Sequence, residues 1–187
     1  MLETIHLSKA FDGRPVLQDV NIRLEKGVHY ALMGPSGCGK TTLLNLLLGL
    51  IKPDSGAVKR ADGLKMSAVF QENRLLEQMT AAANVALVSK AGSAQIEQLL
   101  LRLGIPKESL PQPVSTYSGG MKRRVSLARA LLAEYDVLFL DEPYKGLDEE
   151  TRKTVMQITA EFTAGKTVLL ITHDKTEAAG SIPLALK

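Results

Sequence analysis

The sequence predicts an α/β protein with a mostly parallel sheet, a small antiparallel β part and an inserted helical subdomain. Short strand patterns alternate with helix patterns along the chain, which is typical of parallel sheets. The run DVLFLDEP at 136–143 is apolar on both faces, as strands at the centre of such sheets are. Between 72 and 116 strand patterns disappear. We therefore expect one domain over 1–187, in which 1–71 and 117–187 form the core and 72–116 the helical subdomain.

The first part of the chain predicts a hairpin followed by a strand, a helix and a second strand. Residues 2–9 and 17–24 alternate between apolar and polar, and FDGRP between them has turn chemistry, so we expect an antiparallel hairpin. VHYALMG at 28–34 predicts a strand. TTLLNLLLGL at 41–50 predicts a largely buried helix that ends at its glycine, and MSAVFQ at 66–71 a buried strand.

The second part begins with the helical subdomain, in which AQIEQLLLRLG is a helix pattern and IPKESLPQP, with three prolines, ends the helical run. Helices are then expected over 121–135 and 147–165, on either side of the strand at 136–143. KTVLLITHD at 166–174 predicts the last strand.

Composition excludes several classes of protein. The single cysteine allows no internal disulfide and favours a reducing, cytosolic setting. A net charge of +3, with four Tyr, four Phe and no Trp, does not favour nucleic-acid binding. The N-terminus lacks the pattern of a signal peptide, and the longest apolar runs are far shorter than the ~20 residues of a membrane span. Any membrane association is therefore expected to come through a partner.

The stretch GPSGCGKTT matches the pattern of a glycine, four residues and Gly-Lys-Thr between a strand and a helix. Its backbone N–H groups can surround phosphates at the positive end of the helix dipole. Lys40 is expected to meet the β and γ phosphates, and Thr41 to bind Mg²⁺. An accidental glycine turn is the alternative, which the flanking strand and helix disfavour. The predicted loop residues are Gly34, Pro35, Ser36, Gly37, Cys38, Gly39, Lys40, Thr41 and Thr42.

Polar residues follow three of the predicted buried strands. Asp141 can contribute to the Mg²⁺ site, and Glu142 can polarise an attacking water as a general base. Without the phosphate loop, Asp-Glu-Pro would be read as turn residues. Gln71 and His173 also follow strands; a lone histidine in such a place is more often structural, and Gln71 could be only a polar strand end. These groups are expected to meet at one edge of the sheet.

A second glycine-rich helix start, YSGGMKRR at 117–124, is not needed to hold one nucleotide. Ser118 can be a helix N-cap, and the free N–H groups of the same turn can bind an anion. The phosphate loop, the glutamine after a strand, SGGMKRR, LFLDEP, GLD and THD occur in an order that resembles the ATP-binding cassette ATPases that drive ABC transporters. The resemblance covers nearly the whole chain.

The resemblance implies that two subunits enclose two ATP molecules head to tail. Each SGG motif, Ser118, Gly119 and Gly120, would then face the γ-phosphate held by the other subunit. It further implies that Phe11 stacks on adenine, although a Phe after a strand can also be a core residue. Gln71 would sense Mg²⁺ and the transport subunit, Asp148 would link the two sites, and His173 would contact the γ-phosphate.

The function implied is that of an ATP-binding and ATP-hydrolysing transporter subunit, peripheral on the inner face of the cell membrane. It would power solute transport, with import favoured, through separate transmembrane permease subunits that dock on the helical subdomain. It would dimerise with itself or with a second cassette, and no nucleic-acid partner is expected. FQENRLLEQMTAAANV is similar to the nitrate, sulfonate and taurine importer branch. The alternatives are a soluble ABC-type ATPase acting on nucleic acid or ribosomes, and a non-hydrolysing regulatory module.

The chain departs from the family pattern at several points. Met121 replaces the usual glutamine and Tyr117 the usual leucine of the signature. The stretch between the phosphate loop and Gln71 is short, so part of its β structure is expected to be trimmed. Only fourteen residues follow His173, which leads us to expect no C-terminal regulatory domain.

Overall fold

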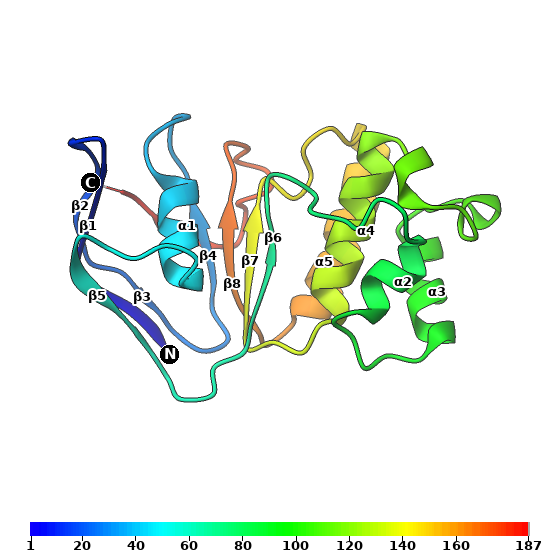
Figure 1. Ribbon diagram of the computed structural model, residues 1–187, viewed down its shortest axis with the longest axis horizontal. Helices are drawn as coiled ribbons and strands as arrows, with labels where there is room; N and C mark the ends of the chain where they lie inside the picture. The colour runs from blue at the N-terminus through cyan, green and yellow to red at the C-terminus, as the bar shows by residue number, and fades with distance from the viewer. Residues whose placement is uncertain (187) are drawn as a thin grey trace. The chain divides into compact units, whose positions relative to one another are not determined.

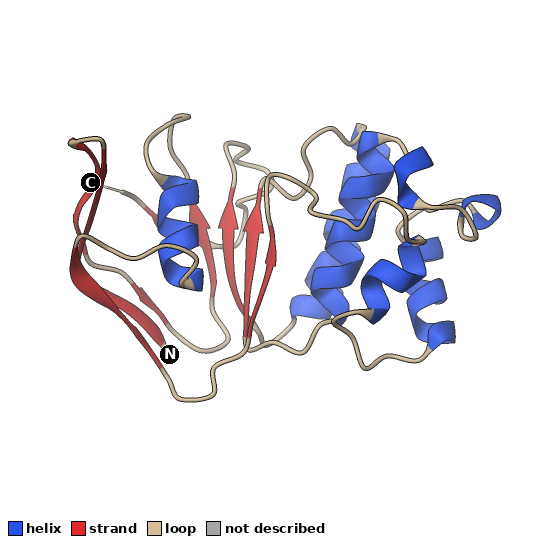
Figure 2. Cartoon of the chain, viewed as in Figure 1, coloured by secondary structure: helices blue, strands red, loops and turns tan. Residues whose placement is uncertain are grey.

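The computed structural model describes residues 1–186, which form two compact units (Figures 1 and 2). The first unit combines Met1–Met66, Asp136–Asp141 and the described residues from Gly165 onward. The second unit combines Ser67–Tyr135 and Glu142–Ala164, and the expected helical segment 72–116 falls within it. Most of the strands lie in the first unit and most of the helices in the second.

An antiparallel sheet in the first unit contains the predicted hairpin. It consists of β1 (Leu2–Phe11), β2 (Arg14–Val20), β3 (Arg23–Leu24) and β5 (Ser55–Arg60), with β2 and β5 both paired to β1. Asp12 and Gly13 form the two-residue turn with φ values of 50° and 74°, as a type I′ turn requires. This confirms the hairpin. β5 was not predicted, and it lies in the stretch expected to have lost β structure.

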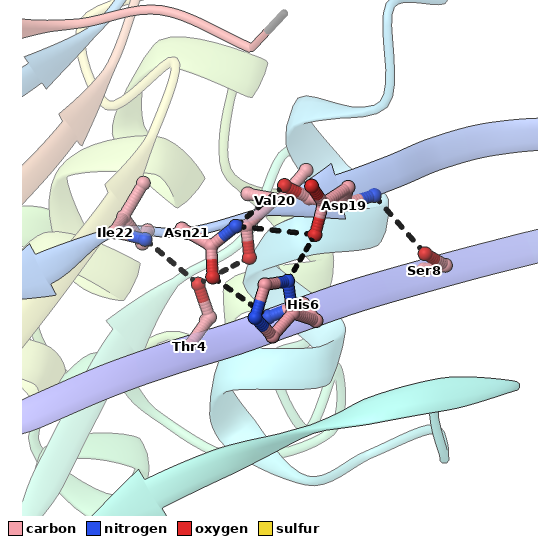
Figure 3. A network of polar contacts seen from close by, with 7 residues as sticks. All are labelled: Thr4, His6, Ser8, Asp19, Val20, Asn21 and Ile22. Atoms are coloured by element: carbon pink, nitrogen blue, oxygen red, sulfur yellow. Dashed lines mark hydrogen bonds and ion pairs between the residues drawn. The ribbon is translucent and has the colours of Figure 1, made fainter.

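A polar network fixes β1 against β2 where their register shifts (Figure 3). His6 Nδ1 lies 2.6 Å from Asp19 Oδ1, and both residues have φ values near the left-handed region, 48° and 49°. The His6 backbone N–H donates to Asn21 Oδ1 at 2.7 Å. Thr4, only 2% exposed, donates through its hydroxyl to the Val20 carbonyl at 2.9 Å. Side-chain hydrogen bonds thus take the place of backbone hydrogen bonds between β1 and β2 that are lost where the register shifts.

A parallel sheet in the first unit carries the strands that precede the candidate site. Its strands run in the order β7 (Val137–Asp141), β8 (Thr167–Ile171), β4 (His29–Leu32) and β9 (Ile182–Leu184). Every residue of β7 and β8 is buried, as their continuous apolar runs predict. β6 (Met66–Val69) begins at the last residue of the first unit. β9 was not predicted.

Helix α1 (Lys40–Leu48) directly follows the glycine-rich loop. Its leucines 43, 44, 46 and 47 are buried, which confirms the expected buried helix. It ends at Gly49, whose φ of 75° lets its N–H bond back to the Asn45 and Leu46 carbonyls.

The second unit is built around helix α4 (Gly119–Leu132). Helices α2 (Ala81–Ala86), α3 (Ser93–Arg102) and α5 (Glu149–Thr163) all contact it, and short 3₁₀ turns at Lys107–Ser109 and Val114–Thr116 precede it. The residues of α4 that face these neighbours are buried, among them Val125, Leu127 and Ala128. α4 begins two residues before the predicted start at 121, because Ser118 caps it.

Candidate active site

The phosphate loop closes around the side chain of Lys40. Its ammonium donates hydrogen bonds to the carbonyls of Gly34 at 2.7 Å and Pro35 at 2.8 Å, and lies 3.8 Å from Cys38 Sγ. The loop is therefore held in a tight turn by the same group that is expected to meet phosphate. A cation bound to carbonyls at this position can also attract an anion to the loop.

Gly39 is required both by backbone conformation and by space. Its φ is 97°, and a Cβ there would lie 2.8 Å from Leu17 Cδ2 and 3.0 Å from the Val16 carbonyl oxygen. Gly39 is also the N-cap of α1 and offers no side-chain cap, and no acidic residue stands in the first turn. The first N–H groups of α1 can therefore serve an anionic ligand.

Thr41 and Asp141 are brought together although they are far apart in the sequence. Thr41 Oγ1 donates a 3.0 Å hydrogen bond to Asp141 Oδ2. Asp141 is the last residue of β7 and is only 2% exposed. A hydroxyl and a carboxylate are ligands that suit Mg²⁺, which binds through one or two carboxylates together with phosphates and water. Among residues 1–186 no group of three or more His, Cys, Asp or Glu could hold a metal without such added ligands.

Two other predicted residues of the first unit lie at strand ends and are exposed. Phe11 is the last residue of β1 and is 46% exposed, so it is not a core residue. The ammonium of Lys9 lies 5.3 Å from the centroid of its ring. His173 follows β8 by two residues and is also exposed. Both side chains are accessible to a ligand.

Glu142 directly follows Asp141 and has a φ of 51°. The left-handed region is uncommon for residues other than glycine, and such strained residues cluster at functional sites. Glu142 belongs to the second unit by contact, whereas Asp141 belongs to the first.

The second glycine-rich helix start is a capped helix N-terminus. Ser118 Oγ accepts a hydrogen bond from the Met121 N–H at 3.2 Å, so the capping role considered for Ser118 is confirmed. A Cβ on Gly120 would lie 3.4 Å from Leu147 Cδ2, which brings the signature close to the GLD segment. A Cβ on Gly119 would meet nothing within 4 Å. The fold of this chain therefore does not require glycine at 119.

Asp148 and Gln71 are the remaining predicted residues of the second unit. Asp148 caps α5, and its Oδ1 accepts the Thr151 N–H at 2.9 Å. This backbone hydrogen bond lowers the pKa of Asp148, so its carboxylate is charged at neutral pH. The Gln71 side chain is exposed, while its backbone carbonyl accepts a hydrogen bond from the Arg123 guanidinium.

Three arginines of α4 that the sequence analysis did not single out bind backbone carbonyls. Arg123 and Arg129 bind carbonyls of the segment after β6. Arg124 donates to the Leu103 and Gly104 carbonyls at 2.8 and 2.7 Å, and to the Gly120 carbonyl at 3.2 Å. The only sequence signal was positive charge on a helix expected to be packed, because backbone acceptors leave no mark in a sequence.

Comparisons with known proteins identify the family of the chain. A family model described as ABC transporter matches residues 17–145. The taurine import ATP-binding protein TauB of Escherichia coli K12 is 37% identical over 193 residues, a match that covers 95% of this chain and 75% of TauB. The spermidine/putrescine import ATP-binding protein PotA of Fusobacterium nucleatum is 34% identical over 95% of this chain, which spans about half (52%) of PotA.

Solved structures show the same fold. The dimeric structure of MJ0796, a bacterial ABC transporter cassette, has a TM-score of 0.88 at 27% identity, with 100% of this chain and 94% of that chain covered. A dimeric post-hydrolysis state of the same cassette, bound to ADP and Pi, has a TM-score of 0.87 at 26% identity. Among the described residues, no helix combines the length and apolar character that crossing a bilayer would require.

Proposed function

The chain belongs to the ABC transporter family, and on this premise we propose that it is the ATP-binding and ATP-hydrolysing subunit of a transporter. The observation that carries the proposal is the hydrogen bond between Thr41 and Asp141 beside a loop already closed on Lys40. A triphosphate site needs a cation, an N–H cradle and a metal-binding pair of oxygens in one place. All three occur together in the first unit.

Each residue has a defined part in the proposed reaction. The loop N–H groups and Lys40 hold the phosphates, and Thr41 and Asp141 hold Mg²⁺. Bound Mg²⁺ would offset negative charge on the β and γ phosphates. Glu142 would accept a proton from the attacking water, a contribution of about 10²–10⁴-fold. His173, exposed after β8, would donate a hydrogen bond to the γ-phosphate.

Gly119 supports the proposal that the signature acts on a nucleotide held by a second subunit. A Cβ at 119 would meet no atom of the described chain within 4 Å, and a glycine there suits close approach by a group from outside the chain. The uncapped N–H groups next to Ser118 would then reach the γ-phosphate across a dimer. The partner cassette in the related structures is a second copy of the same protein.

We further propose that the subunit works on the inner face of a membrane with separate permease subunits. TauB and PotA are import ATP-binding proteins, which favours import. Their named solutes differ, taurine in one case and polyamines in the other, so the permease is expected to set the cargo. Phe11 would stack on the adenine ring, and at the end of β1 the residue is 46% exposed.

Phosphate release by the purified chain tests this function. Hydrolysis should require both ATP and Mg²⁺ and stop when EDTA is added. The Glu142→Gln variant should retain ATP and elute as a dimer with hydrolysis reduced by about 10²–10⁴-fold. Glu150→Gln, an exposed acid in the first turn of α5, is the matched control and should hydrolyse ATP normally. Bound ATP without any turnover in the unmodified chain would instead favour a regulatory module.

A further inference from the structure

Two arginines of α4 form hydrogen bonds to the backbone of residues 70–74. We call this segment, which contains Gln71, the strap. The strap follows β6 and runs beside α4 in Figure 1. We propose that Arg123 and Arg129 are positioning residues that fix Gln71 relative to the signature at the start of α4. The proposal rests on the proposed ATPase function and on the role that the family resemblance implies for Gln71, that of sensing Mg²⁺ and the transport subunit.

The contacts form a regular pattern along the strap. Arg123 donates to the Phe70 carbonyl at 2.6 Å and also to the Gln71 carbonyl. Arg129 donates to the Arg74 carbonyl at 2.8 Å and to the Asn73 carbonyl at 3.1 Å. Each guanidinium therefore spans two carbonyls that lie close together in the sequence. The planar guanidinium of arginine presents its donors in a fixed fork, so each side chain holds its two carbonyls in one defined geometry.

Burial makes these contacts important for the position of the strap. Arg123 is only 6% exposed, so its charge is removed from water and depends on its protein partners. Burial also lowers the pKa of Arg129. A strap that moved away from α4 would leave both cations and four carbonyls without these hydrogen bonds. The clamp therefore resists separation of the strap from the helix.

The strap has further supports that preserve its own shape. The guanidinium carbon of Arg74 lies 3.7 Å from the centroid of the Phe70 ring, and Arg74 has a φ of 47°. Beyond the strap, the fully buried Asn84 side chain binds both the N–H and the carbonyl of Leu76. The backbone is thus held along its length, while the Gln71 side chain remains exposed.

This arrangement has a consequence for catalysis. α4 begins at Gly119, so the helix that carries the signature also holds the strap. A displacement of the strap must move α4 or break the arginine contacts. Gln71 and the signature are therefore expected to respond together to nucleotide, to Mg²⁺ or to a docked permease, with Arg123 and Arg129 acting through the backbone of the strap.

The test combines hydrogen exchange with a double-mutant cycle in the full chain. Arg123→Met removes the hydrogen-bond donors but keeps an apolar side chain. Arg102→Met is the matched control, because it breaks only an exposed ion pair with Glu161 in the same unit. Arg123→Met should speed amide exchange in residues 70–76 about tenfold. It should also raise the Mg²⁺ concentration needed for half-maximal hydrolysis and leave ATP binding in EDTA unchanged. Arg102→Met should change neither the amide exchange of residues 70–76 nor the Mg²⁺ requirement.

The second half of the cycle asks whether Arg123 acts through Gln71. Gln71→Ala alone should raise the Mg²⁺ requirement, and adding Arg123→Met should cause little further change. Unchanged exchange in residues 70–76, or fully additive effects, would overturn the inference. A Gln71→Ala enzyme with normal Mg²⁺ dependence would overturn both the role of Gln71 and the positioning built on it. If Arg123→Met does not fold, Arg123→Lys and Arg129→Lys replace it, with smaller shifts in the same direction expected.

Discussion

The Thr41 hydroxyl donates a 3.0 Å hydrogen bond to the buried carboxylate of Asp141, across 100 positions of sequence. The contact joins the first turn of α1 to the end of β7. The glycine-rich loop and the buried strand identify the two residues, but neither local pattern alone predicts the hydrogen bond between them. The parallel sheet brings them together because its strand ends and helix starts meet at one edge.

This pair predicts a specific loss of Mg²⁺-dependent activity. Asp141→Asn keeps an oxygen that can accept the Thr41 hydroxyl but removes the charge that binds a divalent cation. We expect ATP hydrolysis to fall about 100-fold or more, with ATP binding in EDTA preserved. Phosphate release measured against Mg²⁺ concentration checks this. Asp136→Asn, just before the start of β7, is the control and should hydrolyse ATP normally; equal activity in both variants would contradict the assignment.

A mixing experiment tests whether the signature serves the other subunit. Lys40→Ala disables the phosphate loop, and Ser118→Arg places a bulky cation at the signature, so each variant alone should hydrolyse ATP poorly. In a mixed dimer, the intact loop of one subunit faces the intact signature of the other. Mixing the two variants should therefore restore phosphate release. No recovery, with mixed dimers present by mass spectrometry, would argue against the shared site.

Cys38 offers a direct measure of nucleotide binding. It is the only cysteine of the chain and lies half-buried in the phosphate loop, near Lys40. Because a bound nucleotide would cover the loop, ATP should slow the alkylation of Cys38. Once Cys38 is alkylated, the chain should no longer bind ATP. Mass spectrometry of iodoacetamide-treated protein measures the rate. The Lys40→Ala variant should lose the protection, and an alkylation rate independent of ATP in the unmodified chain would contradict the predicted site.

Tyr135 predicts how stability changes at alkaline pH. The phenol is 5% exposed and donates to the Phe162 carbonyl at 3.3 Å, and burial raises its pKa to about 12. Its folded pKa exceeds the unfolded value, so its contribution is complete below pH 10 and is lost between about pH 10 and 12. The loss is about 1.4 kcal/mol per pH unit.

Urea unfolding of the unmodified protein and of Tyr135→Phe, measured at pH 9 and pH 11, checks this. The variant should lose less stability between the two values, because phenylalanine does not ionise. Lysine and arginine titration affects both proteins alike and cancels in the difference. Equal losses in the two proteins would mean that the pKa of Tyr135 is the same in the folded and unfolded states, which would contradict the raised value.

Much of the fold was predictable because its buried elements carry strong patterns. The apolar runs of β7 and β8, the leucines of α1 and the Asp12–Gly13 turn each predict their own structure. β5 was missed because nearly all of its side chains are exposed, so it shows no apolar alternation. β9 was missed because it is three residues long and contains Pro183, which is tolerated only on an edge strand.

The candidate site was predictable where a motif fixes the backbone. The positive φ and close packing of Gly39 explain why the loop pattern can be read directly from sequence. The roles of Arg123 and Arg129 could not be read in this way. Their partners are carbonyl groups, which every residue possesses, and only the folded path of the strap decides which ones they meet.

The edge strand β2 has a feature that disfavours pairing with other chains. It contains Pro15, which has no backbone N–H to donate to a further strand. An edge interrupted in this way gives an approaching chain no continuous row of hydrogen-bonding groups to extend. Fibre-like growth along this border is therefore disfavoured, even in a crowded cell.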